Sequence, residues 1–395
     1  MRHRNPLLAA AVLGGLLLAA CSGSSSHSAV KPPPPTPPGA NCAADSCLRL
    51  NQIQVVGTHN SYHFRDAPTI FNAISAFDKG LAASIDYTHP VLPTQFSREG
   101  VRQIELDVFA DPQGGRYARP KLRELLDHTT APIPGMSKPG FKVLHASDSD
   151  FNSNCLTFVA CLDAVKGWSD THKQHLPIAI LIEAKDDPVV DPLKMGFVQP
   201  PPLTSSDFDA LDAEIRSVFP ANEMITPDDV RGTHATLEEA VRSGTGWPTL
   251  AAARGKVLFL LDQGNQRERY IAGHPSLRGR IIFTNATPGE PDAAFVEMND
   301  ATGKNLAKIQ TLVREGYIVR TRSDADTLDA RADDTKARDA AIASGAQFVS
   351  TDYPAPDKAP FPGGFEVTLP GDRPWRCDPV NAGPACVSAT LDTLG

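Results

Sequence analysis

The sequence predicts an α/β fold, a single (β/α)8 barrel of the TIM type, and three observations carry the prediction. Short apolar runs recur from residue 50 onward, helix-compatible stretches separate them, and most runs turn polar where they end. Continuous apolar runs that alternate with helices are typical of strands buried on both faces of a parallel sheet. Eight such runs in a chain of 395 residues fit one barrel.

The eight expected strands follow one another with unequal spacing, and long insertions come after the first, second and fourth. The sixth strand is the least well defined, and residues 293–300 could replace or extend it. Helices are expected at 207–218 and at 328–344, where Gly345 is a plausible C-cap. The strands are expected at residues 53–60, 101–109, 142–147, 178–185, 256–262, 280–286, 317–324 and 348–354.

The N-terminal region is expected to be a targeting segment. Residues 1–20 combine a basic start with an apolar run too short to span a bilayer comfortably. The run ends in LAAC at Cys21, which resembles a bacterial lipobox whose cysteine is lipidated; an ordinary cleaved signal peptide is the alternative. Residues 21–40 are rich in Ser and Pro and are expected to form a tether. Residues 41–395 are then expected to form a single barrel domain.

Cysteine usage also favours export. Six cysteines remain beside Cys21, and they fall into three close pairs. An even number in an exported chain suggests disulfides, although six cysteines allow fifteen pairings. The close spacing favours local pairs over a zinc site, because no C-x-x-C motif is present. The expected bridges, which close the ends of the domain, are Cys42–Cys47, Cys155–Cys161 and Cys377–Cys386.

Charge excludes one class of partner. The chain carries 38 Lys and Arg against 46 Asp and Glu, a formal charge of −8, and it has no dense basic stretch. Nucleic-acid-binding domains usually carry a basic patch, so nucleic acid is not an expected partner.

Polar residues end the expected strands on one side of the barrel. In a (β/α)8 barrel the carboxyl ends of all strands meet at one mouth. A spacing of two residues also places both side chains of a Glu-x-Asp or Glu-x-Lys pair on the same face of a strand. The residues expected at the mouth are His59 and Asn60, Glu105 and Asp107, His145, Glu183 and Lys185, Arg320 and Arg322, and Asp352.

This set predicts a hard-cation site beside two histidines. Carboxylate and amide oxygens suit Ca²⁺ or Mg²⁺ and not zinc. Histidines beside a divalent ion are typical of phosphoryl chemistry, in which the ion neutralises the phosphate and the imidazoles serve as acid or base. Each motif alone is common in structural roles, for example at a solvated strand end. Their recurrence at successive strand ends favours one shared functional site.

The order His-Asn, Glu-x-Asp, His, Glu resembles the calcium-dependent phosphoinositide-specific phospholipase C family, especially its secreted bacterial branch. The segments GTHNSYH, IELDVF, VLHASD and LIEAKDD look like that family's blocks, in its order. The resemblance covers about residues 50–355. It implies a (β/α)8-type barrel with one Ca²⁺ at its mouth and a phosphoric diester hydrolase that acts on a phospholipid membrane.

The resemblance also implies a reaction and a role for each residue. The inositol 2-hydroxyl would attack the phosphorus, activated by Ca²⁺ and by a carboxylate, Glu105 or Glu183. The products would be diacylglycerol and a cyclic inositol phosphate, which water can open to the monophosphate. The implied Ca²⁺ ligands are Asn60, Glu105, Asp107 and Glu183, the implied catalytic histidines are His59 and His145, and the implied substrate contacts are Lys185, Arg320 and Arg322.

Two departures and two alternatives accompany the resemblance. The accessory modules of the eukaryotic enzymes and their basic residues for polyphosphorylated headgroups are not evident, so plain phosphatidylinositol or a related inositol lipid is expected. A glycerophosphodiester phosphodiesterase shares the barrel, but that family usually begins with His-Arg-Gly, where this chain has His59, Asn60 and Ser61. A catalytically silent, membrane-tethered binding protein would lack a histidine or a metal carboxylate, and none is missing.

The expected location is that of an exported bacterial lipoprotein, in the cell envelope or secreted, anchored through Cys21.

Overall fold

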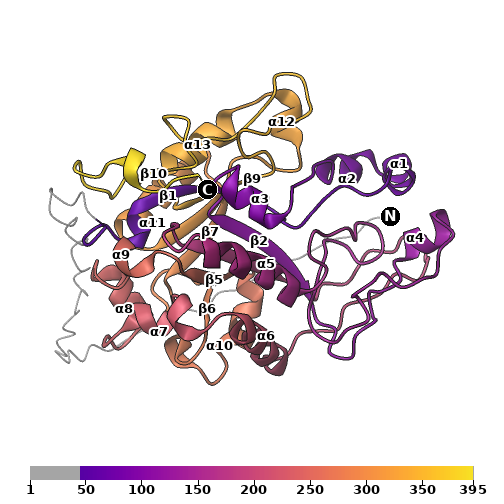
Figure 1. Ribbon diagram of the computed structural model, residues 1–395, viewed down its shortest axis with the longest axis horizontal. Coiled ribbons are helices and arrows are strands. Elements are labelled where there is room, and N and C mark those ends of the chain that lie inside the picture. The colour runs from indigo at the N-terminus through magenta and orange to yellow at the C-terminus, as the bar shows by residue number, and fades with distance from the viewer. Residues whose placement is uncertain (1–44, 395) are drawn as a thin grey trace, which may run out of the picture. The chain divides into compact units, whose positions relative to one another are not determined.

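The computed structural model describes residues 45–394, and these build one parallel barrel (Figure 1). Neighbouring strands follow the order β6-β5-β4-β2-β1-β9-β8-β7, and the pairs along this order are parallel. A parallel bridge between Asn285 and Phe295 links the two ends of the order, so the barrel is nearly closed and the predicted fold class is confirmed. The strands are β1 (Ile53–Thr58), β2 (Gln103–Phe109), β4 (Ile178–Ala184), β5 (Val257–Leu261), β6 (Ile282–Thr284), β7 (Phe295–Asp300), β8 (Ile318–Arg322) and β9 (Phe348–Thr351).

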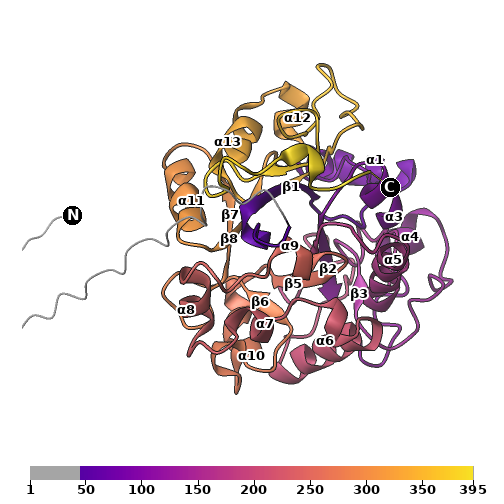
Figure 2. The same ribbon diagram turned by 60° about the vertical axis from the view of Figure 1, so that its left-hand side comes forward.

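Helices surround the strands, as Figure 2 shows for α5, α6, α10 and α11. Because helices cover the outer face and side chains fill the inside, most strand residues are buried on both faces, as the continuous apolar runs predicted. The helices are α1 (Pro68–Phe77), α2 (Lys79–Ser84), α3 (Leu92–Ser97), α4 (Lys121–Leu126), α5 (Phe158–Thr171), α6 (Ser205–Val218), α7 (Pro227–Arg231), α8 (Leu237–Arg242), α9 (Leu250–Ala253), α10 (Arg267–Ile271), α11 (Lys304–Arg314), α12 (Leu328–Ala332) and α13 (Lys336–Ser344).

The prediction of a third barrel strand at 142–147 is wrong. That segment contributes only β3 (Lys142–Val143), which pairs antiparallel with the end of β2. Its apolar run is too short to cross the barrel, and the chain turns back between Ala146 and Asp150. The barrel still has eight strands, because both β6 and β7 form. β7 comes from the segment that was expected only to replace or extend the sixth strand.

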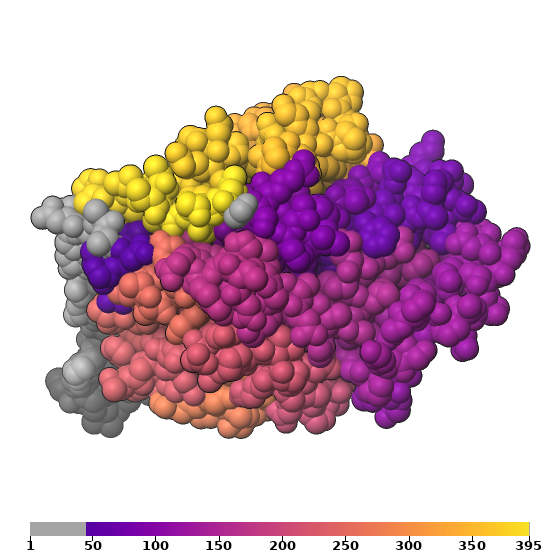
Figure 3. Space-filling view, in the orientation of Figure 1, coloured from indigo at the N-terminus to yellow at the C-terminus, as the bar shows by residue number. Residues whose placement is uncertain are grey.

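The insertions after β1, β2 and β4 are as long as predicted and carry their own helices. Side chains of α1, including Ile70 and Ile74, pack with Phe151 in a small apolar cluster, so the first two insertions lie side by side (Figure 3). The helix expected at 207–218 is α6, where Thr204 accepts a hydrogen bond from the backbone N–H of Asp207 in a capping box. The helix expected at 328–344 divides into α12 and α13, and Gly345 ends the latter with a φ of 73°.

Two of the three predicted disulfides are present, Cys155–Cys161 and Cys377–Cys386. The second begins at the last residue of β10 (Trp375–Cys377), a strand that pairs antiparallel with β1. Cys42 of the third pair, the targeting segment, Cys21 and the tether lie outside the described residues. Within residues 45–394, no helix combines the length and the apolar character needed to cross a bilayer.

Serine at both Cys155 and Cys161 is expected to lower the free energy of unfolding by about 2 kcal/mol, because the bridge closes a short loop of the unfolded chain. The loop runs from the end of the second insertion into α5, whose Phe158 is fully buried. Urea unfolding of the double variant, with Cys377–Cys386 intact, measures the change. An unchanged midpoint would mean that the bridge does not constrain the unfolded chain.

Candidate active site

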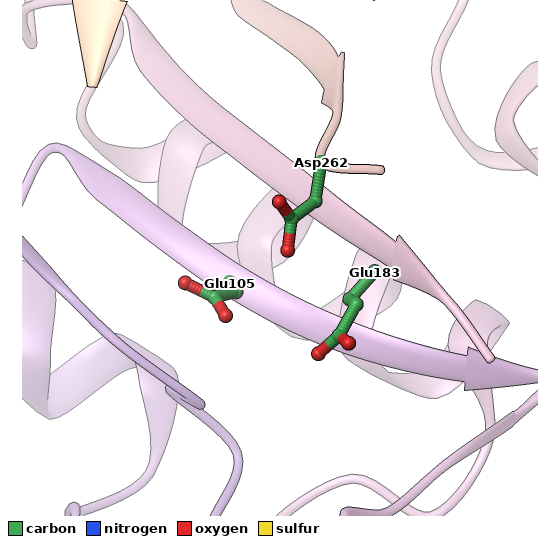
Figure 4. Close-up of side chains that lie close together, drawn as sticks. All are labelled: Glu105, Glu183 and Asp262. Carbon is green, nitrogen blue, oxygen red and sulfur yellow. The ribbon is translucent and has the colours of Figure 1, made fainter. Parts of the chain in front are cut away.

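Three carboxylates meet at the carboxyl ends of neighbouring strands. Glu105 lies on β2, Glu183 lies on β4, and Asp262 follows β5 directly. One oxygen of each lies within 4.8 Å of those of the other two, and Figure 4 shows the three side chains around a common space. Such a cluster of oxygen donors is the kind of site that Ca²⁺ occupies.

Asp262 is the member of this cluster that sequence reasoning missed. It ends the run KVLFLLD, just as Glu183 comes near the end of its own run. The signal that indicates the other site residues, an acid at the end of an apolar run, is therefore present at Asp262 as well. A single acid after a strand is weaker evidence for a site than two acids spaced two residues apart, so Asp262 is not among the residues expected from the sequence.

Asp107 and Lys185 lie beside the three carboxylates as an ion pair. The Lys185 ammonium is 3.0 Å from Asp107 Oδ2 and 2.7 Å from Glu183 Oε2. Burial and the charge of Glu183 raise the pKa of the Asp107 carboxyl well above its usual value, although Lys185 opposes this. Asp107 does not belong to the three-carboxylate cluster, and Lys185 contacts two of the predicted metal ligands.

Asn60 is held rigidly at the turn that follows β1. Its backbone has a φ of 43°, a left-handed conformation that asparagine tolerates better than most residues. Its side-chain amide donates to Tyr87 Oη at 3.0 Å and accepts from Tyr62 Oη at 3.5 Å. The amide is completely buried, and its orientation is fixed by two tyrosines from the first insertion.

His59 is oriented by a buried carboxylate. Its Nδ1 donates to Asp352 Oδ1 at 2.9 Å, and its Nε2 lies 3.8 Å from Glu105 Oε1. Burial, followed by the charges of Arg322 and Arg320, holds the pKa of His59 well below its ordinary value. With Nδ1 bonded to Asp352, Nε2 is the ring nitrogen on the side of the carboxylate cluster.

His145 reaches the mouth from the loop after β3, and not from a barrel strand as predicted. Its Nδ1 donates to Asp150 Oδ2 at 2.8 Å, while Asp150 Oδ1 accepts from His63 Nε2 at 2.9 Å. Burial acts to raise the pKa of Asp150, but His63 and His145 together hold it well below its usual range. Each predicted catalytic histidine thus has a buried aspartate on Nδ1.

The two arginines at the end of β8 have different surroundings. Arg320 is buried and forms ion pairs with Glu105 and with Glu297, the latter at 2.9 Å. Arg322 lies 3.4 Å from both His59 Nε2 and Asp352 Oδ2. Arg320 therefore acts first as the counter-ion of Glu105, whereas Arg322 borders the histidine.

Glutamine at Arg320 is expected to lower the free energy of unfolding by about 3–5 kcal/mol, because it leaves buried carboxylates without their counter-ion. Chemical denaturation measures the loss, with the exposed Arg314→Gln as the matched control. A loss no larger than that of the control would show that these carboxylates do not depend on Arg320.

Comparison with known proteins decides the family. The model of the family "Phosphoinositide phospholipase C, Ca²⁺-dependent" matches residues 48–379, most of the chain. The chain belongs to this family. The predicted enzyme class, a phosphoric diester hydrolase that depends on Ca²⁺, is confirmed, and the match favours it over the glycerophosphodiesterase and silent-binding alternatives.

Solved structures similar to this family member include two phospholipases and a putative phosphodiesterase. A calcium-dependent phosphoinositol-specific phospholipase C from Pseudomonas sp. is 20% identical over 86% of this chain and 99% of its own, with a TM-score of 0.49. A Ca²⁺-dependent phosphatidylinositol-specific phospholipase C from Streptomyces antibioticus is 22% identical over 77% and 95%, with a TM-score of 0.47. A putative glycerophosphoryl diester phosphodiesterase from Silicibacter pomeroyi is 12% identical over 65% and 81%, with a TM-score of 0.26. No curated protein matches the chain.

Calcium affinity is expected to rise with pH between 6 and 9. Burial raises the pKa of Glu105 to about 8, and burial together with a hydrogen bond to Glu297 raises that of Asp262 to about 9. A raised pKa lets each carboxyl keep its proton to a higher pH, where that proton competes with Ca²⁺, so raising the pH removes the competition. Calorimetric titration with Ca²⁺ in two buffers of different ionisation enthalpy measures affinity and proton release together. A pH-independent affinity without proton release would contradict the expectation.

Proposed function

We propose that this protein is an exported phospholipase C that cleaves the glycerol–phosphate bond of phosphatidylinositol to diacylglycerol and a cyclic inositol phosphate. The observation that supports this most is the pair of aspartate-oriented histidines beside one carboxylate cluster. His59 pairs with Asp352, and His145 pairs with Asp150. His59 Nε2 lies 3.8 Å from Glu105 Oε1, so a group that would transfer protons lies next to a group that would bind the metal.

The carboxylates Glu105, Glu183 and Asp262 would hold Ca²⁺, with Asn60 and Asp107 at the edge of the same site. Bound there, Ca²⁺ would neutralise the phosphate and lower the pKa of the inositol 2-hydroxyl. The donor set fits the ion, because all of these residues offer hard oxygens and none offers sulfur. Lys185 already neutralises part of their charge, which limits their mutual repulsion before the ion arrives.

The two histidines would divide the proton transfers. With its Nδ1 proton held by Asp352, His59 would accept at Nε2 the proton that the attacking inositol 2-hydroxyl loses, and Arg322 beside it would offer positive charge to a phosphoryl oxygen. His145 is more exposed than His59 and would protonate the departing diacylglycerol oxygen. Positioned acids and bases of this kind each contribute roughly 10²- to 10⁴-fold to the rate.

The charges at the mouth favour a headgroup with one phosphate. Arg322 and Lys185 are basic, but Lys185 is bound to two carboxylates. Asp262 and Glu297 lie on the β5 and β7 side, which therefore offers acidic groups to further phosphates on the inositol ring. Plain phosphatidylinositol is therefore the proposed substrate, in preference to its bisphosphate.

A substrate panel tests this assignment. The purified enzyme with Ca²⁺ is given phosphatidylinositol, phosphatidylinositol 4,5-bisphosphate and glycerophosphocholine, and the water-soluble products are separated. The expected result is rapid release of inositol phosphate from the first lipid, slow release from the second and none from the third. Faster cleavage of glycerophosphocholine would overturn the proposal in favour of a glycerophosphodiesterase.

The same proposal places the enzyme in the cell envelope, anchored through a lipidated Cys21. The sequence LAAC supports it, together with the apolar run before it and the two disulfides of an exported chain. Expression of the full chain and of Cys21→Ser, followed by detergent phase partition and mass spectrometry of the N-terminus, tests it. The full chain should enter the detergent phase with an acylated cysteine, and an unmodified, water-soluble product would refute anchoring.

A further inference from the structure

Large apolar side chains are exposed mainly in the segments that follow the carboxyl ends of the barrel strands. Nine are exposed among residues 45–394: three follow β1, one follows β2, two follow β4 and one follows β8. The other two, Val387 and Leu394, lie in the C-terminal tail, whose β10 pairs with the start of β1 at the opposite end of the barrel. Single exposed apolar residues are ordinary, but their concentration in the segments around one mouth indicates a contact surface.

The segment between β4 and α6 carries the most exposed of these side chains. Val190 is 79% exposed and Leu193 is 62% exposed, and the neighbouring Lys194 is exposed as well. We call residues 187–198 the β4 loop. Keeping two large apolar side chains in water close together is unfavourable, because each would gain free energy from burial. Their exposure therefore indicates an apolar partner for this loop.

Hydrogen bonds hold the β4 loop in a defined conformation. The Asp191 carboxylate accepts from three successive backbone N–H groups, those of residues 195–197, at 2.8, 2.7 and 3.1 Å. The side-chain amide of Gln199 bonds to both backbone groups of Val189 across the loop, at 2.9 and 3.1 Å. A loop braced in this way presents its apolar side chains in a fixed direction and does not have to be ordered when it meets its partner.

The β4 loop runs from the carboxylate cluster to the segment that carries His145. It begins two residues after Lys185. At its end, the backbone N–H of Val198 donates to Asp148 Oδ2 at 2.7 Å, and Ser147 Oγ donates to the carbonyl oxygen of Val198 at 3.4 Å. His145 is the histidine proposed to protonate the departing diacylglycerol oxygen. The loop thus borders the side of the mouth from which diacylglycerol would leave.

We propose that the β4 loop inserts Val190 and Leu193 into the phospholipid bilayer that carries the substrate, next to the place where diacylglycerol is released. The inference rests on the proposed function, because a lipid substrate requires the mouth to face the membrane. Both side chains gain free energy when they are buried among acyl chains. The stem of Lys194 would lie along the apolar surface while its ammonium stays among the phosphate headgroups.

Tryptophan fluorescence of the full-length protein on vesicles tests the insertion. Leu193→Trp is compared with Leu394→Trp, an exposed leucine of the C-terminal tail, on vesicles of phosphatidylcholine and phosphatidylinositol with Ca²⁺ removed by chelator. Relative to the unmodified protein, Leu193→Trp should add blue-shifted emission that phosphatidylcholine with a spin-labelled acyl chain quenches, and Leu394→Trp should add neither. Absence of quenching in Leu193→Trp, or equal quenching in both variants, would overturn the proposal.

Kinetics separate failure of this inference from failure of the proposed function. Every sample carries Cys21→Ser, so that no lipid on that residue holds the chain on the membrane. Val190→Ser with Leu193→Ser should cleave phosphatidylinositol in vesicles about 10-fold more slowly, and a short-chain phosphatidylinositol dissolved as monomers at an unchanged rate. The matched pair Val387→Ser with Leu394→Ser should leave both rates unchanged.

Each other outcome has one meaning. An equal loss on vesicles and on the monomeric lipid would refute a membrane role for the β4 loop, because the change would then act on the site itself. An unchanged rate on vesicles would refute it as well. Failure of the unmodified protein to cleave either lipid would refute the proposed function, and the fluorescence of Leu193→Trp would still decide whether the loop enters the bilayer.

Discussion

Glutamine at His59 is expected to lower kcat by roughly 10²- to 10⁴-fold at saturating phosphatidylinositol and Ca²⁺. The physical reason is the geometry of the imidazole, whose Nδ1 proton is held by Asp352 while Nε2 lies near Glu105 Oε1. Glutamine can donate or accept a hydrogen bond there, but it cannot transfer a proton at neutral pH. The rate is measured by release of inositol phosphate from mixed micelles.

Two controls separate chemistry from folding in this experiment. His234→Gln changes a half-buried histidine in the loop between α7 and α8, outside the mouth, and should leave kcat unchanged. Calcium binding to His59→Gln, measured by calorimetry, should stay near that of the unmodified protein. A loss of kcat below a few-fold would show that His59 is not an acid or base of this reaction.

Glutamine at Glu183 is expected to raise the dissociation constant for Ca²⁺ by 100-fold or more. Loss of residues that only support metal ligands costs about 10- to 100-fold in affinity, so loss of a direct carboxylate should reach the upper end of that range. Glu183 is one of the three carboxylates whose oxygens lie within 4.8 Å of one another. Calorimetric titration with Ca²⁺ reports affinity without any need for turnover.

A second acid tests which residues form the metal site. Asp262→Asn should weaken Ca²⁺ binding about as much as Glu183→Gln, because Asp262 belongs to the same cluster. Glu290→Gln, an exposed acid in the loop between β6 and β7, is the matched control and should have no effect. Normal affinity in Asp262→Asn would return the site to the ligand set expected from the sequence, with Asn60 and Asp107 in place of Asp262.

Much of the site could be predicted from the residues at the ends of the strands, because a parallel barrel brings these ends to one mouth regardless of the conformation of the loops. Glu105 and Glu183 illustrate this, since each follows from its position in an apolar run. Asp262 could have been predicted in the same way, because it also ends an apolar run. The prediction that His145 lies near the mouth is correct, but the prediction that a barrel strand carries it is wrong. Its segment is too short to be a barrel strand, and the histidine reaches the site from a loop.

The partners of the histidines could not be predicted, because they depend on how distant loops pack. His63 and Asp150 meet only when the first and second insertions lie together, and nothing in the local pattern of either residue indicates it. Tyr87 likewise reaches Asn60 from the far end of the first insertion. The spacing of apolar residues predicts helices and strands, whereas contacts between irregular segments depend on the whole fold.

Phosphorus NMR of the purified enzyme with phosphatidylinositol micelles tests the central claim most directly. Spectra are recorded with Ca²⁺, without added Ca²⁺ and with chelator. A cyclic inositol phosphate signal that appears with Ca²⁺ and disappears with chelator is the predicted result. Turnover that persists in chelator, or a glycerophosphate product from glycerophosphodiesters with no cleavage of the lipid, would contradict the assignment.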